Sequence, residues 1–127
     1  MVAGCAGPQR PAGVAAVAHG PPIDASALQA LYAEPHREDG VVLHGEHAGA
    51  HWTRWTKPDG SLQLTAAHGL FADTGTFTLR GNALCSRWEH IDTGQENCVH
   101  LVRVGPDRYT SYDNAGVEGS TFQVSPP

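Results

Sequence analysis

Short runs in which apolar and polar residues alternate fill most of the chain from residue 41 to residue 124. Between Thr76 and Arg80, for example, Phe77 and Leu79 alternate with threonines and an arginine. Alternation with a period of two is typical of a β-strand with one buried face. Glycine, proline, aspartate and asparagine mark turns between the runs. The pattern predicts eight strands, at residues 41–47, 51–57, 61–66, 76–80, 84–89, 98–104, 108–113 and 120–124.

Sequential antiparallel pairing is the simplest topology for strands joined by such short turns. Eight strands are enough for an up-and-down sheet to close and leave no free edge. We therefore predict a mainly β fold, an antiparallel meander that is closed or nearly closed into a barrel. A two-sheet β-sandwich of the same strands is the alternative.

Helical periodicity is confined to the segment from Asp24 to Ala33. Asp24 or Ser26 suits the N-cap, and Pro35 stops the helix. The segment is too short to be stable alone, so its apolar face must pack against the sheet or cover an open end of the barrel. That face consists of Leu28, Leu31 and Tyr32.

The 127 residues suit one domain, which we place at residues 23–127 after a flexible tether at residues 1–22 that is rich in alanine, glycine and proline. The formal charge is −5, and the eight lysines and arginines are scattered singly. Without a basic stripe, we exclude nucleic acid as a partner. We expect a monomer.

The three cysteines fall into a pair and a single residue. Cys85 and Cys98 lie on neighbouring runs, so a disulfide between them would cross a hairpin, which suggests an oxidising compartment. Cys5 follows Val2-Ala3-Gly4, the pattern of small residues that precedes the lipid-modified cysteine of bacterial lipoproteins. We expect an exported protein, periplasmic or an outer-membrane lipoprotein, that touches the membrane only through such an anchor. The alternative for Cys5 is a free thiol in the tail.

The order of motifs resembles an uncharacterised family of small exported bacterial β proteins, a domain-of-unknown-function family. The resemblance runs from about Ala25 to Val124 and rests on the segments PDG, DTGTF, LCSRW, NCVHLVRV, RYTSYDNAG and GSTFQV. Phe77 stands where tryptophan is usual, and Pro35-His36-Arg37-Glu38 replaces a tighter connection that contains glycine. The resemblance implies export and a disulfide but no activity.

Three of the eight histidines lie close together, His44, His47 and His51. Imidazoles are ligands for Zn and Cu, so the alternative function is a metal-binding periplasmic protein. On a strand, however, His44 and His47 point to opposite faces. A shared site would require the turn at Gly49 to bring His51 back beside His44. Solvated surface histidines and no cofactor are the simpler expectation.

Nothing in the sequence points to catalysis, because it has no nucleophile elbow, no phosphate loop and no spaced metal motif. We expect a non-enzymatic envelope module that binds a protein or a small apolar ligand. An inhibitor of another protein would have a filled core and an entering segment, residues 19–22 or 92–97. A carrier would have a cavity lined by Trp52 or Trp55 together with Phe77, Leu101 and Phe122.

Aromatic and arginine residues supply the remaining ligand candidates. One member of each of the pairs Trp52/Trp55 and Tyr109/Tyr112 should face the core, because residues three apart on a strand point to opposite faces. If the interior is polar, Arg54, Arg87 or Arg103 becomes able to hold a carboxylate. The residues that we predict to bind a ligand are Trp52, Trp55, Phe77, Trp88, Arg103 and Tyr109.

Overall fold

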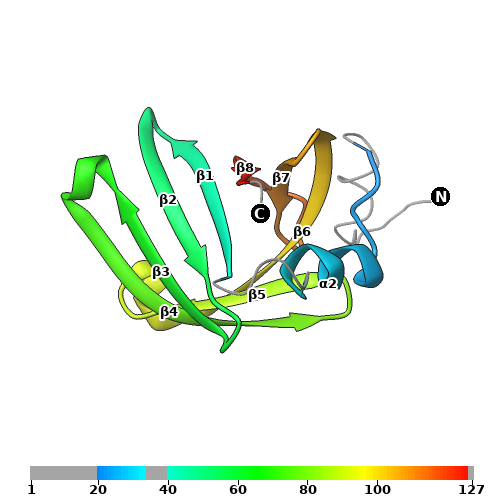
Figure 1. Ribbon diagram of the computed structural model, residues 1–127, viewed down its shortest axis with the longest axis horizontal. Helices are drawn as coiled ribbons and strands as arrows, with labels where there is room; N and C mark the ends of the chain where they lie inside the picture. The colour runs from blue at the N-terminus through cyan, green and yellow to red at the C-terminus, as the bar shows by residue number, and fades with distance from the viewer. Residues whose placement is uncertain (1–19, 34–39, 126–127) are drawn as a thin grey trace.

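The computed structural model describes residues 20–33 and 40–125, which form a closed antiparallel barrel of eight strands and one helix (Figure 1). Each strand pairs with the next along the chain, and β1 closes the sheet by pairing with β8. The predicted barrel is therefore confirmed and the sandwich is wrong. The elements are α2 (Ala25–Ala33), β1 (Val41–His47), β2 (Ala50–Thr56), β3 (Ser61–Ala66), η1 (Ala67–Gly69), β4 (Phe71–Arg80), β5 (Ala83–Trp88), η2 (Ile91–Gly94), β6 (Glu96–Gly105), β7 (Arg108–Tyr112) and β8 (Glu118–Val124).

The fourth strand begins five residues before its predicted start at residue 76. Phe71 pairs with Ala66 and Gly75 with Leu62, so the first half of β4 extends the ladder with β3. Alternation of apolar and polar residues is not clear in this segment, because Asp73 occupies a buried position. Ladder pairing, and not hydrophobic pattern, determines where this strand begins.

Helix α2 packs its apolar face into one end of the barrel. The Asp24 side chain caps it by accepting a hydrogen bond from the backbone N–H of Ala27 at 2.8 Å. Leu28 is completely buried, and it packs with Leu31 against Val41 and Val124 at the closing pair of strands. In Figure 1, α2 lies on the side of the barrel away from the β3–β4 hairpin. The helix therefore closes this end.

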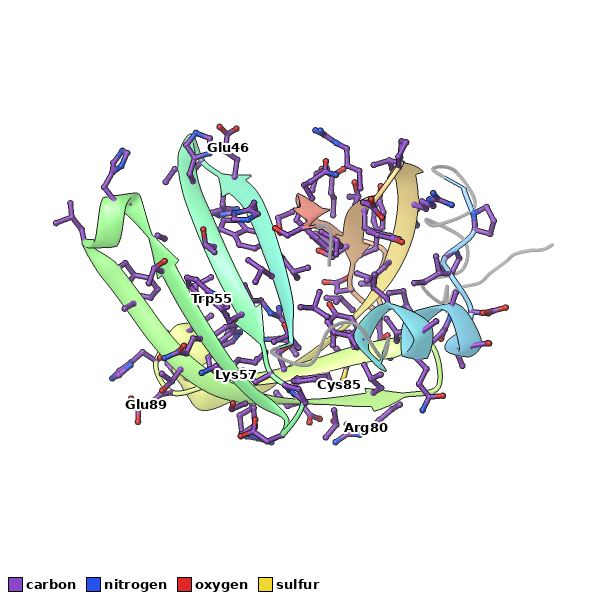
Figure 2. All side chains as sticks on the ribbon, viewed as in Figure 1. Glu46, Trp55, Lys57, Arg80, Cys85 and Glu89 are labelled. Carbon is purple, nitrogen blue, oxygen red and sulfur yellow. A yellow bond between two sulfur atoms is a disulfide. The ribbon has the colours of Figure 1, made fainter. Side chains whose placement is uncertain are left out.

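The opposite end, which we call the mouth, carries the β1–β2, β3–β4, β5–β6 and β7–β8 hairpins. Figure 2 shows Glu46 near the first of these hairpins and Lys57 at the far end of β2. Three of the connections at the mouth contain non-glycine residues with positive φ: Ala48, His68 and Asp92, at 52°, 58° and 55°. Left-handed backbone of this kind suits the right-handed twist of paired strands.

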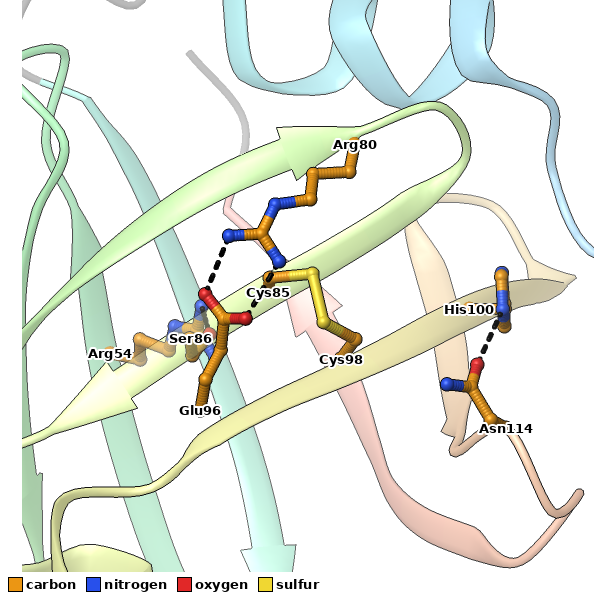
Figure 3. The surroundings of a disulfide bond; sticks show 8 residues. All are labelled: Arg54, Arg80, Cys85, Ser86, Glu96, Cys98, His100 and Asn114. Atoms are coloured by element: carbon orange, nitrogen blue, oxygen red, sulfur yellow. Dashed lines mark hydrogen bonds and ion pairs between the residues drawn. A yellow bond between two sulfur atoms is a disulfide. The ribbon is translucent and has the colours of Figure 1, made fainter.

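Cys85 and Cys98 are paired directly opposite each other on β5 and β6 and form a disulfide, with their Cα atoms 4.0 Å apart. Over the bridge, the Arg80 guanidinium spans from β4 to β6 and donates two hydrogen bonds to Glu96, at 2.6 and 2.9 Å (Figure 3). Bridge and ion pair lie on the outer face of the barrel, because the neighbouring Ser86 points inward.

Part of the sequence-based description lies outside the described residues: Cys5, residues 1–19 of the expected tether, and Pro35. Among the residues that the structure describes, no helix has the length and apolar character needed to cross a membrane.

Candidate functional site

The interior of the barrel contains a cavity of about 700 Å³ that reaches the mouth. Cavities of several hundred Å³ with mostly apolar walls are typical of sites for small molecules. The wall includes aromatic and aliphatic side chains from seven of the eight strands, a few uncharged polar groups and an arginine. Among the lining residues are Trp52, Arg54, Leu64, Ser86, Trp88, Asn97, Leu101, Ser111 and Phe122, with Asp92, Asp113 and Glu118 near the mouth.

Trp52 is the aromatic residue of the wall on β2, where it pairs with Gly45 of β1. Its ring lies 6.2 Å from that of Phe122, centroid to centroid, and Tyr109 stacks on the other side of Phe122 at 6.0 Å. A Cβ atom at position 45 would lie only 2.3 Å from the indole of Trp52. Glycine is therefore required at position 45 for the indole to lie across β1.

Arg54 lies on the same face of β2 as Trp52 and extends across the interior of the barrel. Its Nη2 donates a hydrogen bond to Oγ of Ser86 at 3.1 Å, although Ser86 belongs to β5, three strands away (Figure 3). The guanidinium carbon lies 5.5 Å from the ring centroid of Trp88, within the range of a cation–π interaction. Two strands on opposite sides of the barrel thus fix the position of one cation.

The Arg54 cation has no partner of opposite charge among the described residues. Its Nε is buried without a hydrogen-bond partner, and so is the hydroxyl of Tyr32 on α2. Burial lowers the pKa of Arg54, and Tyr32 partly opposes this shift. Burial raises the pKa of Tyr32 and the nearby Arg54 opposes it, so the hydroxyl stays protonated and supplies no counter-charge. Arg54 is held beside the helix that closes the barrel, with spare hydrogen-bonding capacity.

The charge at the mouth has the opposite sign. Asp92 accepts a hydrogen bond from Asn97, and the Asp113 carboxylate accepts backbone hydrogen bonds from Ala115 and Val117, both at 2.9 Å. Glu118 adds a third carboxylate to the lining. The cavity is therefore negative at its rim and positive where Arg54 lies.

Buried Asp73 holds the β5–β6 loop in place at the mouth. Its carboxylate accepts hydrogen bonds from the backbone N–H groups of Thr74, His90 and Ile91, the last at 2.9 Å, and from Nδ1 of His90 at 3.1 Å. Burial raises the pKa of Asp73, but the donors of Ile91, His90 and Thr74 outweigh it and hold this pKa below its usual value. The site is a structural anchor for the residues that follow β5.

The structure separates the predicted ligand-binding residues into three groups. Trp52 and Trp88 line the cavity, as do Leu101 and Phe122. Phe77 and Tyr109 face inward but pack against Tyr32 and Phe122, in the closed part of the barrel.

Trp55 and Arg103 lie outside the cavity. Trp55 is on the outer face of β2, because its neighbours Arg54 and Thr56 point inward. Arg103 is exposed near the end of β6, where its Nε donates to the Gly105 carbonyl at 3.3 Å. The alternation along β6 predicts an inward side chain for Arg103. However, this part of β6 pairs with β7 and no longer with β5, and the side chain does not reach the cavity.

The three clustered histidines do not meet at one point. His44 is hydrogen-bonded to Ser125 and Thr53, whereas the two-residue turn at Ala48-Gly49 pairs His51 with Glu46. His47 lines the mouth instead. Within residues 20–33 and 40–125, only two groups of three histidine, cysteine, aspartate or glutamate side chains bring their ligand atoms within 4.8 Å of one another, and neither contains these histidines. One consists of Asp73, Glu89 and His90, and the other includes the disulfide cysteines with Glu96.

The sequence signals Arg54 only weakly. Its parity with Trp52 puts both residues on one face, but nothing in the sequence shows that this face is the interior and not the exterior. The sequence offers Arg54, Arg87 and Arg103 for a polar interior, and of these three the structure brings only Arg54 into the cavity.

Comparison of the chain with protein-family models, curated proteins and solved structures finds no significant match. We therefore infer the function from the cavity and the residues that line it.

Proposed function

We propose that the protein is a non-enzymatic binding module that holds a small, largely apolar molecule inside its barrel. The observation that carries this proposal is the cavity of about 700 Å³ with Trp52, Trp88 and Phe122 in its wall. A barrel whose only task is to present loops to a protein partner needs no such space, because a filled interior is more stable.

The side chains in the wall supply apolar contact and a few polar groups that fix orientation, as expected for binding without reaction. Ser86, Asn97 and Ser111 are among the uncharged polar groups. None of these forms part of an acid–base pair or of a nucleophile with an adjacent base among the described residues. An exported location is part of the proposal, and the Cys85–Cys98 disulfide supports it.

A titration with the neutral fluorescent probe N-phenyl-1-naphthylamine tests this function. The probe should brighten on binding to the wild-type protein, and native mass spectrometry should show a complex of one probe per chain. Leu64→Trp adds volume to the wall of the cavity, whereas Gln63→Trp places the same side chain on the exposed face of the same strand. The expected result is that Leu64→Trp weakens probe binding at least fivefold while Gln63→Trp leaves it unchanged.

Two results would contradict the proposal. One is a failure of the wild-type protein to bind the probe. The other is equal binding by Leu64→Trp and Gln63→Trp, both folded as judged by circular dichroism, which would place the probe on the outer surface.

A further inference from the structure

We infer that the ligand is a small organic monoanion, a carboxylate on an apolar body, and that Arg54 binds its carboxylate inside the barrel. This inference rests on the proposed function and specifies the chemical class of ligand for the same cavity. It follows from the charge, the hydrogen-bonding capacity and the position of Arg54.

The charge of Arg54 is uncompensated among the described residues. A guanidinium stays protonated in proteins, and an isolated buried charge is costly unless it is paired. The hydroxyl of Ser86 and the ring of Trp88 stabilise the cation but do not neutralise it. An anion that enters the cavity supplies the missing charge, so binding gains more from a carboxylate than from a neutral group of the same shape.

The hydrogen-bonding capacity of Arg54 fits a planar carboxylate. A guanidinium has five N–H donors in a rigid fork, which match the two oxygens of a carboxylate. Ser86 takes one of these donors, and the buried Nε has no partner. Because Arg54 is the only arginine that residues 20–33 and 40–125 contribute to the cavity wall, and none of the lysines in these ranges lines it, the site suits a single negative charge and not a dianion.

The position of Arg54 sets the orientation of the ligand. Arg54 is the fourth residue along β2 after Ala50 at the mouth, a distance of roughly 13 Å along a strand. Asp92, Asp113 and Glu118 make the rim negative. The rim repels the carboxylate of the ligand and Arg54 attracts it. The ligand therefore binds with its carboxylate deep in the barrel and its apolar body nearer the mouth, against Trp52 and Phe122.

Matched pairs of carboxylates and carboxamides test the inference. The probes are naphthalene-2-carboxylate against naphthalene-2-carboxamide, and decanoate against decanamide, titrated at pH 7 by displacement of N-phenyl-1-naphthylamine and by calorimetry. In each pair the shape is conserved and the charge is removed. The wild-type protein should bind at least one carboxylate tenfold or more tightly than its amide, as expected for a charge-assisted hydrogen bond.

Variants at two arginines assign the preference to a residue. Arg54→Met should abolish the difference between carboxylate and amide while the neutral probe still binds, and Arg54→Lys should retain part of it. Arg103→Met changes an exposed arginine and should leave the difference intact. If N-phenyl-1-naphthylamine binds in the cavity but the wild-type protein shows no preference for either carboxylate, the anionic class of ligand is wrong and the proposed function stands. A preference that survives in folded Arg54→Met also overturns the role of Arg54. Failure of the neutral probe itself contradicts the proposed function instead.

Discussion

The carboxylate of Asp73, near the start of β4, accepts a hydrogen bond from the backbone N–H of Ile91 at 2.9 Å, and so joins one wall of the mouth to the next loop. Ile91 also lines the cavity. Because the same carboxylate accepts hydrogen bonds from the backbone N–H groups of His90 and Thr74, a single buried side chain connects the loop after β5 to β4. The shape of the mouth therefore depends on one charged residue.

Asp73→Asn should destabilise the protein. An amide keeps one acceptor oxygen but turns a donor toward the N–H groups of His90 and Ile91, so we expect a loss of about 2 kcal/mol in the free energy of unfolding. Urea titration followed by circular dichroism measures it. Asp59→Asn is the matched control, because Asp59 caps the exposed β2–β3 turn through Ser61, and it should cost less. Equal losses in the two variants would mean that burial adds nothing to the role of Asp73.

The contribution of Asp73 should disappear in acid. Its pKa is lower in the folded state than in the unfolded state, where an aspartate titrates near 3.9. The stabilisation is therefore fully present above the unfolded pKa and is lost as the pH falls through the folded pKa. Unfolding titrations between pH 7 and pH 2.5 should show a constant difference between wild type and Asp73→Asn down to about pH 5, and a shrinking one below. A difference that grows on acidification would contradict the direction of the shift.

Reduction of the disulfide should lower the melting temperature. Cys85 and Cys98 are 13 residues apart, and closing a loop of this size contributes about 3 kcal/mol by restricting the unfolded chain. That corresponds to roughly 10 °C in a domain of this size. Differential scanning calorimetry with and without a reductant measures this change in melting temperature. The Cys85→Ala/Cys98→Ala variant should melt at the temperature of the reduced protein, and the reductant should not change that temperature. An unchanged melting temperature on confirmed reduction would show that the bridge is not needed for stability.

Gly45→Ala should displace Trp52 and change its fluorescence. The new Cβ would lie 2.3 Å from one indole atom and 2.5 Å from another, and the ring cannot move freely because Phe122 packs against it. We expect a loss of about 1–3 kcal/mol, the usual cost of overpacking, together with a shift in tryptophan emission. Gly105→Ala is the control, since its Cβ would meet Arg108 at an ordinary 3.6 Å and its backbone needs no positive φ. A stable Gly45→Ala variant with unchanged emission would show that the wall of the cavity can accommodate the added methyl group without displacing Trp52.

The sequence was sufficient to predict the number of strands, the helix and the cysteine pair, because alternation, capping and turn chemistry are local. Two features depend on register and closure, which are not local. Glu46 and not His44 lies opposite His51, because the turn at Ala48-Gly49 contains two residues. Alternation likewise places Trp52 and Trp55 on opposite faces, but only the closed barrel shows which of them is inside. The cavity could not be predicted, because its volume depends on how far the side chains of eight strands reach toward one axis.

Arg54→Met should stabilise the ligand-free protein, in contrast to most substitutions inside a barrel. Methionine fills similar space and removes a charge that no described residue pairs, and replacing buried charge by apolar side chains often stabilises by about 1 kcal/mol or more. Melting temperatures should be compared after the protein has been unfolded, dialysed and refolded to remove any molecule that copurifies. Arg103→Met, at an exposed arginine, should change the melting temperature little. A lower melting temperature in Arg54→Met would mean that Arg54 stabilises the barrel itself. A higher melting temperature together with weaker carboxylate binding would mean that Arg54 lowers the stability of the free protein and serves ligand binding.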